Sequence, residues 1–417
     1  MKKIVLVLFL ILATLLSGCN GISNNNDSSA PVDSKENELE TDPDLDNDVV
    51  IENETLEIYD ISNKVIGQFE HYGAVTQLED GFIYAKIPTG RTDKITKMDY
   101  YRYVFATKEN IKIGTIENWS YEAGYCNSYI SNHLFISVTT DINVAEKRTL
   151  KILDIDLDSN TMSEISSEKG GFPYNSMTVA GNRVLITKVV TNGSNLEEYN
   201  TETKETKKLM SFAFDDKSNV GEAVRQITSD GSTISLLILK MEVNGDTSLR
   251  MDVYDYEMKF LYSVDMSTIH SDENELRQGV AHFSVLNDYV YYENFSLTRF
   301  LGRIEENTVK PIFETNPTFA IASEIVNSKD TDLFYQSFST DNDLYLLNSA
   351  DGTIKKAIFY ADDERYQIIN ISRDKNDQLL ISMYFKDPDT GKKLPPRLYY
   401  INLSDLNFTN SQNGSVI

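Results

Sequence analysis

Cysteine, histidine and tryptophan are scarce in this 417-residue sequence, which has two cysteines, four histidines and one tryptophan. The histidines are scattered, and no two of them have the spacing of metal ligands. The sequence also lacks a Gly-x-Ser-x-Gly elbow, a Walker loop, a dinucleotide fingerprint, a His-Glu-x-x-His pair and a Cys-x-x-Cys pair. These absences remove the usual local signatures of hydrolases, nucleotide-dependent enzymes, metalloproteases and redox proteins, and no cofactor is expected.

Positive charge is also in short supply, with 39 lysines and arginines against 64 acids and a formal net charge of −25. A body this acidic repels polyanions. We therefore expect no nucleic-acid partner and no direct docking of the body on anionic lipid. Cationic partners and divalent ions remain compatible with the charge, as does a plain solvated surface.

Long amphipathic helices are missing too. Short helical turns are conceivable at Asn219–Ile227 and Asp272–Gln278, but the rest of residues 51–408 alternates in the manner of strands. The 24 tyrosines suit strands that are buried on one side and wet at one end. The body is therefore predicted to be all-β.

A strand, turn, strand pattern recurs along this body, first at Ala74–Ala85, where Glu-Asp-Gly forms the turn. The first apolar residues after successive turns lie 43 to 56 residues apart: Phe82, Leu134, Val184, Ile234, Val290, Leu333 and Leu379. A second pair of strands follows each hairpin, and four strands at this period are typical of a β-propeller blade. We predict a β-propeller of seven four-stranded blades, with six or eight blades and a β-sandwich as alternatives.

The two ends of the body indicate how such a ring closes. Leu56–Tyr59 and Leu398–Ile401 both resemble the second strand pair, which gives one such segment more than there are hairpins. The surplus predicts that the ring is closed by an N-terminal strand, here Leu56–Tyr59, which completes the last blade. Residues 409–417 are expected to form a frayed tail.

The N-terminus has two lysines, an apolar run from Ile4 to Leu12 and the sequence Leu16-Ser17-Gly18-Cys19. This run resembles the lipobox of bacterial lipoproteins at all four positions. The resemblance implies a signal peptide over residues 1–18, cleavage before Cys19 and a lipid anchor on its sulfur. It places the protein at the cell membrane on the extracytoplasmic side, and leaves open which membrane of the envelope it occupies.

Residues 19–50 are predicted to be a lipidated, disordered and acidic tether. From residue 20 on, nine acids face one lysine, and large apolar side chains are almost absent. The acids of Asp42–Asp48 are spaced like a calcium loop, but Asn47 stands where glycine is needed and Asn53 where glutamate is needed. We therefore expect no metal site there. Cys126 has no partner once Cys19 is lipidated, so we expect it to be buried.

Asp154, Asp156 and Asp158 alternate with apolar residues, which predicts that all three line one exposed strand face.

The candidate ligand-binding residues stand just before or within the first strand of each repeat. They are Tyr72, Asn127, Tyr174, Arg225, His282, Phe319 and Tyr366. If the repeats form a ring, these positions surround one mouth of its channel. Packing of the tyrosines between blades explains each of them equally well.

Two functions follow as hypotheses. The first is a membrane-anchored protein that binds or scaffolds an envelope protein, a peptide or a glycan at a propeller face, without catalysis. The alternative is an extracytoplasmic propeller enzyme acting on carbohydrate, such as a lyase, lactonase or glycoside hydrolase, with carboxylates contributed by different blades.

Overall fold

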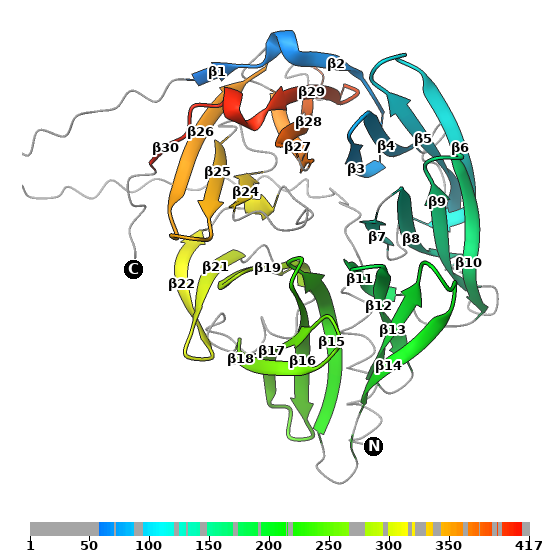
Figure 1. Ribbon diagram of the computed structural model, residues 1–417, viewed down its shortest axis with the longest axis vertical. Helices are drawn as coiled ribbons and strands as arrows, with labels where there is room; N and C mark the ends of the chain where they lie inside the picture. Colours follow the sequence, from blue (N-terminus) through cyan, green and yellow to red (C-terminus); the bar gives the residue numbers. More distant parts are fainter. Residues whose placement is uncertain are drawn as a thin grey trace, which may run out of the picture.

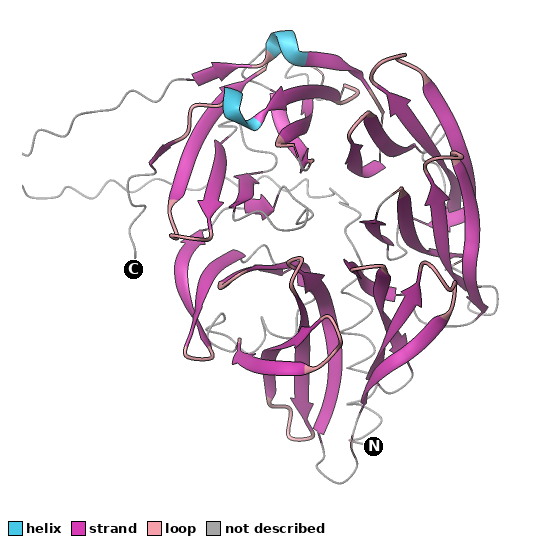
Figure 2. Ribbon diagram, viewed as in Figure 1, coloured by secondary structure: helices cyan, strands magenta, loops and turns pink. Residues whose placement is uncertain are grey.

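The computed structural model describes residues 58–70, 72–86, 95–120, 125–130, 132–141, 148–169, 174–190, 193–213, 215, 220–266, 280–294, 299–315, 319–321, 331–336, 343–361, 366–374, 376–385, 390 and 394–410. The predicted signal peptide, Cys19 and the tether therefore lie outside the described residues. Nearly all described elements are strands, and the all-β prediction is confirmed (Figure 2). No helix among the described segments is long and apolar enough to span a bilayer.

Most strands form groups of four in which each strand pairs antiparallel with the next. We call these groups meanders 1 to 7. Meander 1 comprises β3 (Tyr72–Leu78), β4 (Gly81–Lys86), β5 (Ile95–Val104) and β6 (Asn110–Ser120). Meander 2 comprises β7 (Tyr125–Ile130), β8 (His133–Thr140), β9 (Thr149–Asp156) and β10 (Thr161–Lys169). Meander 3 comprises β11 (Tyr174–Ala180), β12 (Arg183–Val190), β13 (Gly193–Asn200) and β14 (Thr206–Ala213).

The pattern continues through the rest of the chain. Meander 4 comprises β15 (Val220–Ser229), β16 (Thr233–Glu242), β17 (Thr247–Asp255) and β18 (Phe260–Asp265). Meander 5 comprises β19 (Val280–Leu286), β20 (Tyr289–Asn294), β21 (Arg299–Glu305) and β22 (Thr308–Thr315). Meander 6 comprises β23 (Phe319–Ile321), β24 (Thr331–Gln336), β25 (Asp343–Asn348) and β26 (Ile354–Tyr360). Meander 7 comprises β27 (Tyr366–Arg373), β28 (Gln378–Phe385), β29 (Arg397–Asn402) and, from the other end of the chain, β2 (Val65–Gln68).

The meanders follow one another around a common centre, a propeller-like arrangement in which β3, β7, β11 and β27 lie inward and β6, β10 and β14 lie at the periphery (Figure 1). The second strands are covered on both faces, so they read as continuous apolar runs rather than as alternating ones. Phe82–Ala85 in β4 is an example, with every residue buried. This is why the apolar residue after each turn was a good marker of the repeat.

Hydrophobic clusters lie between successive meanders rather than at one central core. Phe135 of meander 2, for example, packs with Val184 of meander 3, and Leu237 of meander 4 packs with Val290 of meander 5. The same holds between the last and first meanders, where Leu380 and Leu398 pack with Phe82. Each sheet is thus stabilised by its two neighbours.

The third strand of several meanders ends in Asp or Asn, and the side chain caps the following turn. Asp156 accepts hydrogen bonds from the backbone N–H groups of Asp158 and Ser159, at 2.9 and 3.2 Å. The same capping position is occupied by Asn200, Asp255, Asn348 and Asn402. Four residues after Asp156, Asn160 has a φ of 53°, a left-handed conformation that Asn tolerates well.

The N-terminal strand was predicted incorrectly in one respect. The strand that pairs with β29 is β2, whereas β1 (Ile58–Asp60) within the predicted segment pairs in parallel with β26. A short 3₁₀ turn, η1 (Ser62–Lys64), separates the two strands, and the Asp60 carboxylate accepts the Ser62 N–H at 2.8 Å. At this turn the chain leaves the sheet of β26 and joins the sheet of β29.

Three other expectations are corrected. Asn219–Ile227 is not helical, because Val220–Ser229 forms β15; the other proposed turn, Asp272–Gln278, lies outside the described residues. Asp154 is not exposed: it is 7% exposed and bonded to Nδ1 of His133 at 2.8 Å, the strand β8 supplying the partner. The predicted frayed tail, residues 409–417, begins instead with a strand, β30 (Thr409–Asn410), which pairs with β26; the rest of the tail lies outside the described residues. A short 3₁₀ turn, η3 (Leu403–Asp405), precedes β30.

Candidate functional site

Five meanders begin with an aromatic residue. The first residues of β3, β7, β11, β23 and β27 are Tyr72, Tyr125, Tyr174, Phe319 and Tyr366. Because the meanders share one strand order and direction, the first residues of their first strands lie at the same end of the inner strands. At these positions the structure describes the backbone, which places the residues by register.

Four of the seven candidate ligand-binding residues thus share one register position, namely Tyr72, Tyr174, Phe319 and Tyr366. His282 is the third residue of β19, opposite Glu293, and Arg225 lies in the middle of β15. On β7 the sequence interpretation chose Asn127 and missed Tyr125, which opens the strand. An aromatic residue at the start of the inner strand, as at Tyr72, Tyr174 and Tyr366, was the signal that would have found it.

The first strands of four meanders carry a one-residue irregularity. One extra residue stands in the first strand of meanders 3, 4, 5 and 7, namely Asn175, Arg225, Ala281 and Ile369. Such bulges bend a strand and re-aim its side chains. Their similar heights, four or five residues before the end of each strand, make them part of the repeated design of the inner strands.

Arg225 occupies one of these bulges and has no exposed surface. Burial lowers the pKa of its guanidinium to about 10, and the charge interaction with Tyr292 of β20 offsets only part of that effect. Arg225 therefore belongs to the boundary between meanders 4 and 5. Because its side chain is completely buried, Arg225 does not reach a ligand in solvent, and its prediction as a ligand-binding residue at the channel mouth is not met in this structure.

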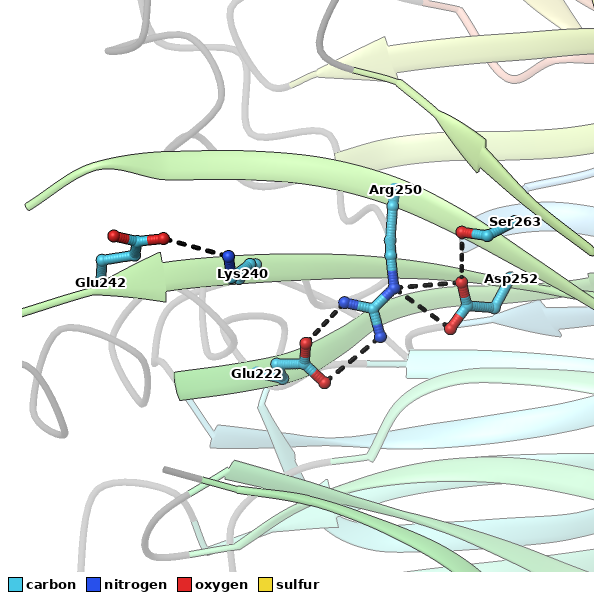
Figure 3. Close-up of polar contacts among 6 residues, drawn as sticks. All are labelled: Glu222, Lys240, Glu242, Arg250, Asp252 and Ser263. Carbon is cyan, nitrogen blue, oxygen red and sulfur yellow. Dashed lines mark hydrogen bonds and ion pairs between the residues drawn. The ribbon is translucent and has the colours of Figure 1, made fainter. Parts of the chain in front are cut away.

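Meander 4 begins with Val220 rather than an aromatic residue, and it has a charged network near the end at which β15 begins (Figure 3). The Arg250 guanidinium on β17 forms two hydrogen bonds with the Glu222 carboxylate of β15, from Nη1 at 2.5 Å and from Nη2 at 3.2 Å. Its Nε donates to both oxygens of Asp252, at 3.0 and 3.2 Å. Ser263 on β18 donates to Asp252 at 2.8 Å, so the network crosses the sheet from its first strand to its fourth.

A second pair, Lys240 with Glu242 at 3.0 Å, lies beside this network on β16 (Figure 3). Burial acts to lower the pKa of Arg250, but the hydrogen bonds with Glu222 and Asp252 outweigh it and raise this pKa above its usual value. The guanidinium therefore stays charged and holds two carboxylates in fixed positions. Such an arrangement orders the end of meander 4 at which β15 begins.

Metal binding finds no support in the described part of the chain, where no three His, Cys, Asp or Glu side chains are grouped to hold an ion. Cys126 is on β7, with its backbone opposite Ser137, while the environment of its side chain lies outside the described residues. Its predicted burial remains a prediction.

No family model and no curated protein matches this sequence. Among solved structures, the chain is similar to the β-propeller domain of the Trilobed protease from Pyrococcus furiosus, with 12% identity over 78% of this chain and 95% of that one and a TM-score of 0.48. The WD40 β-propeller domain of Doa1 gives 9% identity over 82% and 97% with a TM-score of 0.44, and the computationally designed Ika8 protein gives 10% over 81% and 98% with a TM-score of 0.44. At these scores the likeness adds nothing to what the strand pairing shows.

Proposed function

We propose that the protein is a seven-bladed β-propeller in which each meander is a blade and β2 closes the ring by completing the last one. The hydrophobic clusters between successive meanders, and the cluster shared by meanders 7 and 1, support this proposal. The contact of β27 with β3 is a further support.

The propeller is anchored through lipid on Cys19 to the extracytoplasmic face of the cell membrane. Support comes from the resemblance of Leu16-Ser17-Gly18-Cys19 to a lipobox and from the apolar run before it. The acidic residues 20–50 act as a tether, and the first described strand begins at Ile58.

The anchored ring binds an envelope protein, a peptide or a glycan at one mouth of its channel. The observation that carries this function is the shared register of Tyr72, Tyr125, Tyr174, Phe319 and Tyr366 at the start of the inner strands. Aromatic residues supply large contact area with few rotatable bonds, and they stack on sugar rings and pack on peptides. Catalysis is not part of the proposal.

Position-specific photocrosslinking in intact cells tests this function. A photoreactive phenylalanine at Tyr174 of the full chain is expected to give a defined adduct, as are the same replacements at Tyr72 and Tyr366. The matched control is Glu202, exposed in the turn at the opposite end of the same meander as Tyr174. Adducts from Glu202 with none from the three tyrosines would contradict binding at this mouth.

The adduct also identifies the ligand class, because protease digestion removes a protein or peptide and glycosidase digestion removes a glycan. Turnover of glycans or lactones by the purified chain would replace the binding function with the enzyme alternative.

A further inference from the structure

The segment Ile58–Glu70 touches three meanders in succession. Its first part, β1, pairs with residues 358–360 of β26 in meander 6, and the Ile61 N–H donates to the Tyr360 carbonyl at 3.0 Å. The Ile61 side chain is completely buried among residues of meanders 6 and 7. The second part, β2, then lies along β29 of meander 7.

The segment ends in meander 1, where Phe69 is inserted among three aromatic rings. The ring centroids of Phe82, Tyr84 and Tyr103 lie 5.1, 5.7 and 5.0 Å from that of Phe69, each in an edge-to-face arrangement. The Phe69 N–H donates to the carbonyl of Pro396 at 2.9 Å.

Gly67 makes room for the Phe69 ring. A Cβ at residue 67 would stand 3.1 Å from Cε2 of Phe69, closer than ordinary contact. The segment is thus held by the buried side chains of Ile61 and Phe69 and by short strands.

These strands pair over very few residues. The register of β1 has three residue pairs and that of β2 also has three, with an irregularity between Val65 and Gly67. By contrast, β16 is paired along its length on both edges. Val65 is 45% exposed, and the ion pairs Lys64–Asp405 and Lys86–Glu70 are between exposed side chains, where they contribute little. Segments with few buried contacts and short ladders open before the rest of a domain does.

We propose that Ile58–Glu70 is a releasable clasp, and that its release uncovers a strand-addition site for an extended peptide that carries an aromatic side chain. The site consists of the outer edge of β29 and the pocket formed by Phe82, Tyr84 and Tyr103. In the cell, the pulling force that opens the clasp reaches Ile58 through the tether. This part of the proposal rests on the proposed lipid anchor. The chemistry of the site follows from its present occupant, Val65-Ile66-Gly67-Gln68-Phe69.

Single-molecule pulling on the purified full chain with Cys19→Ser tests the clasp without requiring the anchor. With handles at Asn20 and Glu202 the load enters at Ile58, and we expect an early, reversible step. Thirteen residues at about 3.5 Å each give a step of roughly 45 Å, far shorter than the roughly 450 Å released when the rest of the chain between the handles unfolds. With handles at Glu202 and Asp351, both exposed turn residues, the clasp carries no load and the short step is absent.

The Phe69→Ala variant is expected to lower the force of the short step at least twofold and to leave the later ruptures unchanged. Val65→Ala is the matched control, since Val65 lies on the same strand and is largely exposed; its short step should keep the wild-type force. A first rupture that releases the whole body in one event, or a short step that Phe69→Ala does not weaken, would overturn the clasp.

The strand-addition site is tested on the same molecule held open. A peptide with the sequence of residues 62–70 is expected to prolong the open state tenfold or more at saturating concentration, and the same peptide with alanine in place of Phe69 should not. Reclosing that neither peptide slows would overturn the site. Either failure leaves the lipid anchor and the binding mouth untouched, because these are tested by fractionation and crosslinking.

Discussion

The guanidinium of Arg250 is the common counter-charge of Glu222 and Asp252, whose side chains are 30% and 9% exposed. Replacing Arg250 with Met leaves both carboxylates in a partly buried site without that charge. We expect the free energy of unfolding, measured by urea denaturation, to fall by about 2 kcal/mol. The Lys240→Met variant removes a more exposed cation with one partner and should change it by less than about 0.5 kcal/mol. If the two variants lost the same free energy of unfolding, the Arg250 network would contribute no more to stability than a single surface ion pair.

Single residues also mark where sequence reasoning ends. Tyr72, Tyr174 and Tyr366 could be named from the sequence because they precede recognisable apolar runs, and the strand boundaries place them at one register position. The complete burial of Arg225 could not be foreseen, because it depends on one extra residue in β15 relative to β16. A bulge of this kind has no sequence signature when the neighbouring residues are ordinary strand formers.

Among the elements, the turn after β9 makes a prediction about pH. Hydrogen bonds from Ser159 and Asp158 lower the pKa of Asp156 below its usual value in the folded protein. A group with a lowered folded-state pKa adds stability above its unfolded pKa and loses that contribution as the pH falls through its folded-state pKa. Asn occupies the same position in other meanders, at Asn200 and Asn348, and its side-chain oxygen accepts similar bonds without titrating.

At pH 7, Asp156→Asn is therefore expected to have the same thermal unfolding midpoint as the wild type. Between pH 7 and pH 3 its midpoint should fall by less than that of the wild type. Asp156→Ala removes the acceptor and should lower the midpoint at both pH values. A wild-type pH dependence in the Asn variant would mean that Asp156 contributes nothing to acid sensitivity.

Elements differ in how well the sequence specifies them. The hairpins could be predicted because Gly, Asn and Asp mark their turns and because each second strand is buried on both faces. The separate roles of β1 and β2 could not, since a three-residue strand such as Ile58–Asp60 has little pattern of its own. Its parallel pairing with β26 depends on a chain segment three hundred residues away.

For the whole molecule, membrane attachment is predicted to depend on one cysteine. Cys19→Ala should move the protein from the membrane fraction to the soluble fraction of lysed cells, with an unchanged thermal unfolding midpoint, because the first described strand begins at Ile58, far along the chain from residue 19. Cys126→Ala is the matched control and should remain with the membrane. Release of both variants, or of neither, would contradict an anchor on Cys19.

The two ends of the folded body share one strand. Ile358 of β26 pairs with Ile58, and Lys356 pairs with Thr409, two residues away and thus about 7 Å along the strand. If Cys19 carries lipid, the predicted tether reaches the body at this shared strand, at the periphery of the ring (Figure 1). A disordered tether does not fix the orientation of the body, so the ring would turn freely above the membrane and a ligand could approach either opening.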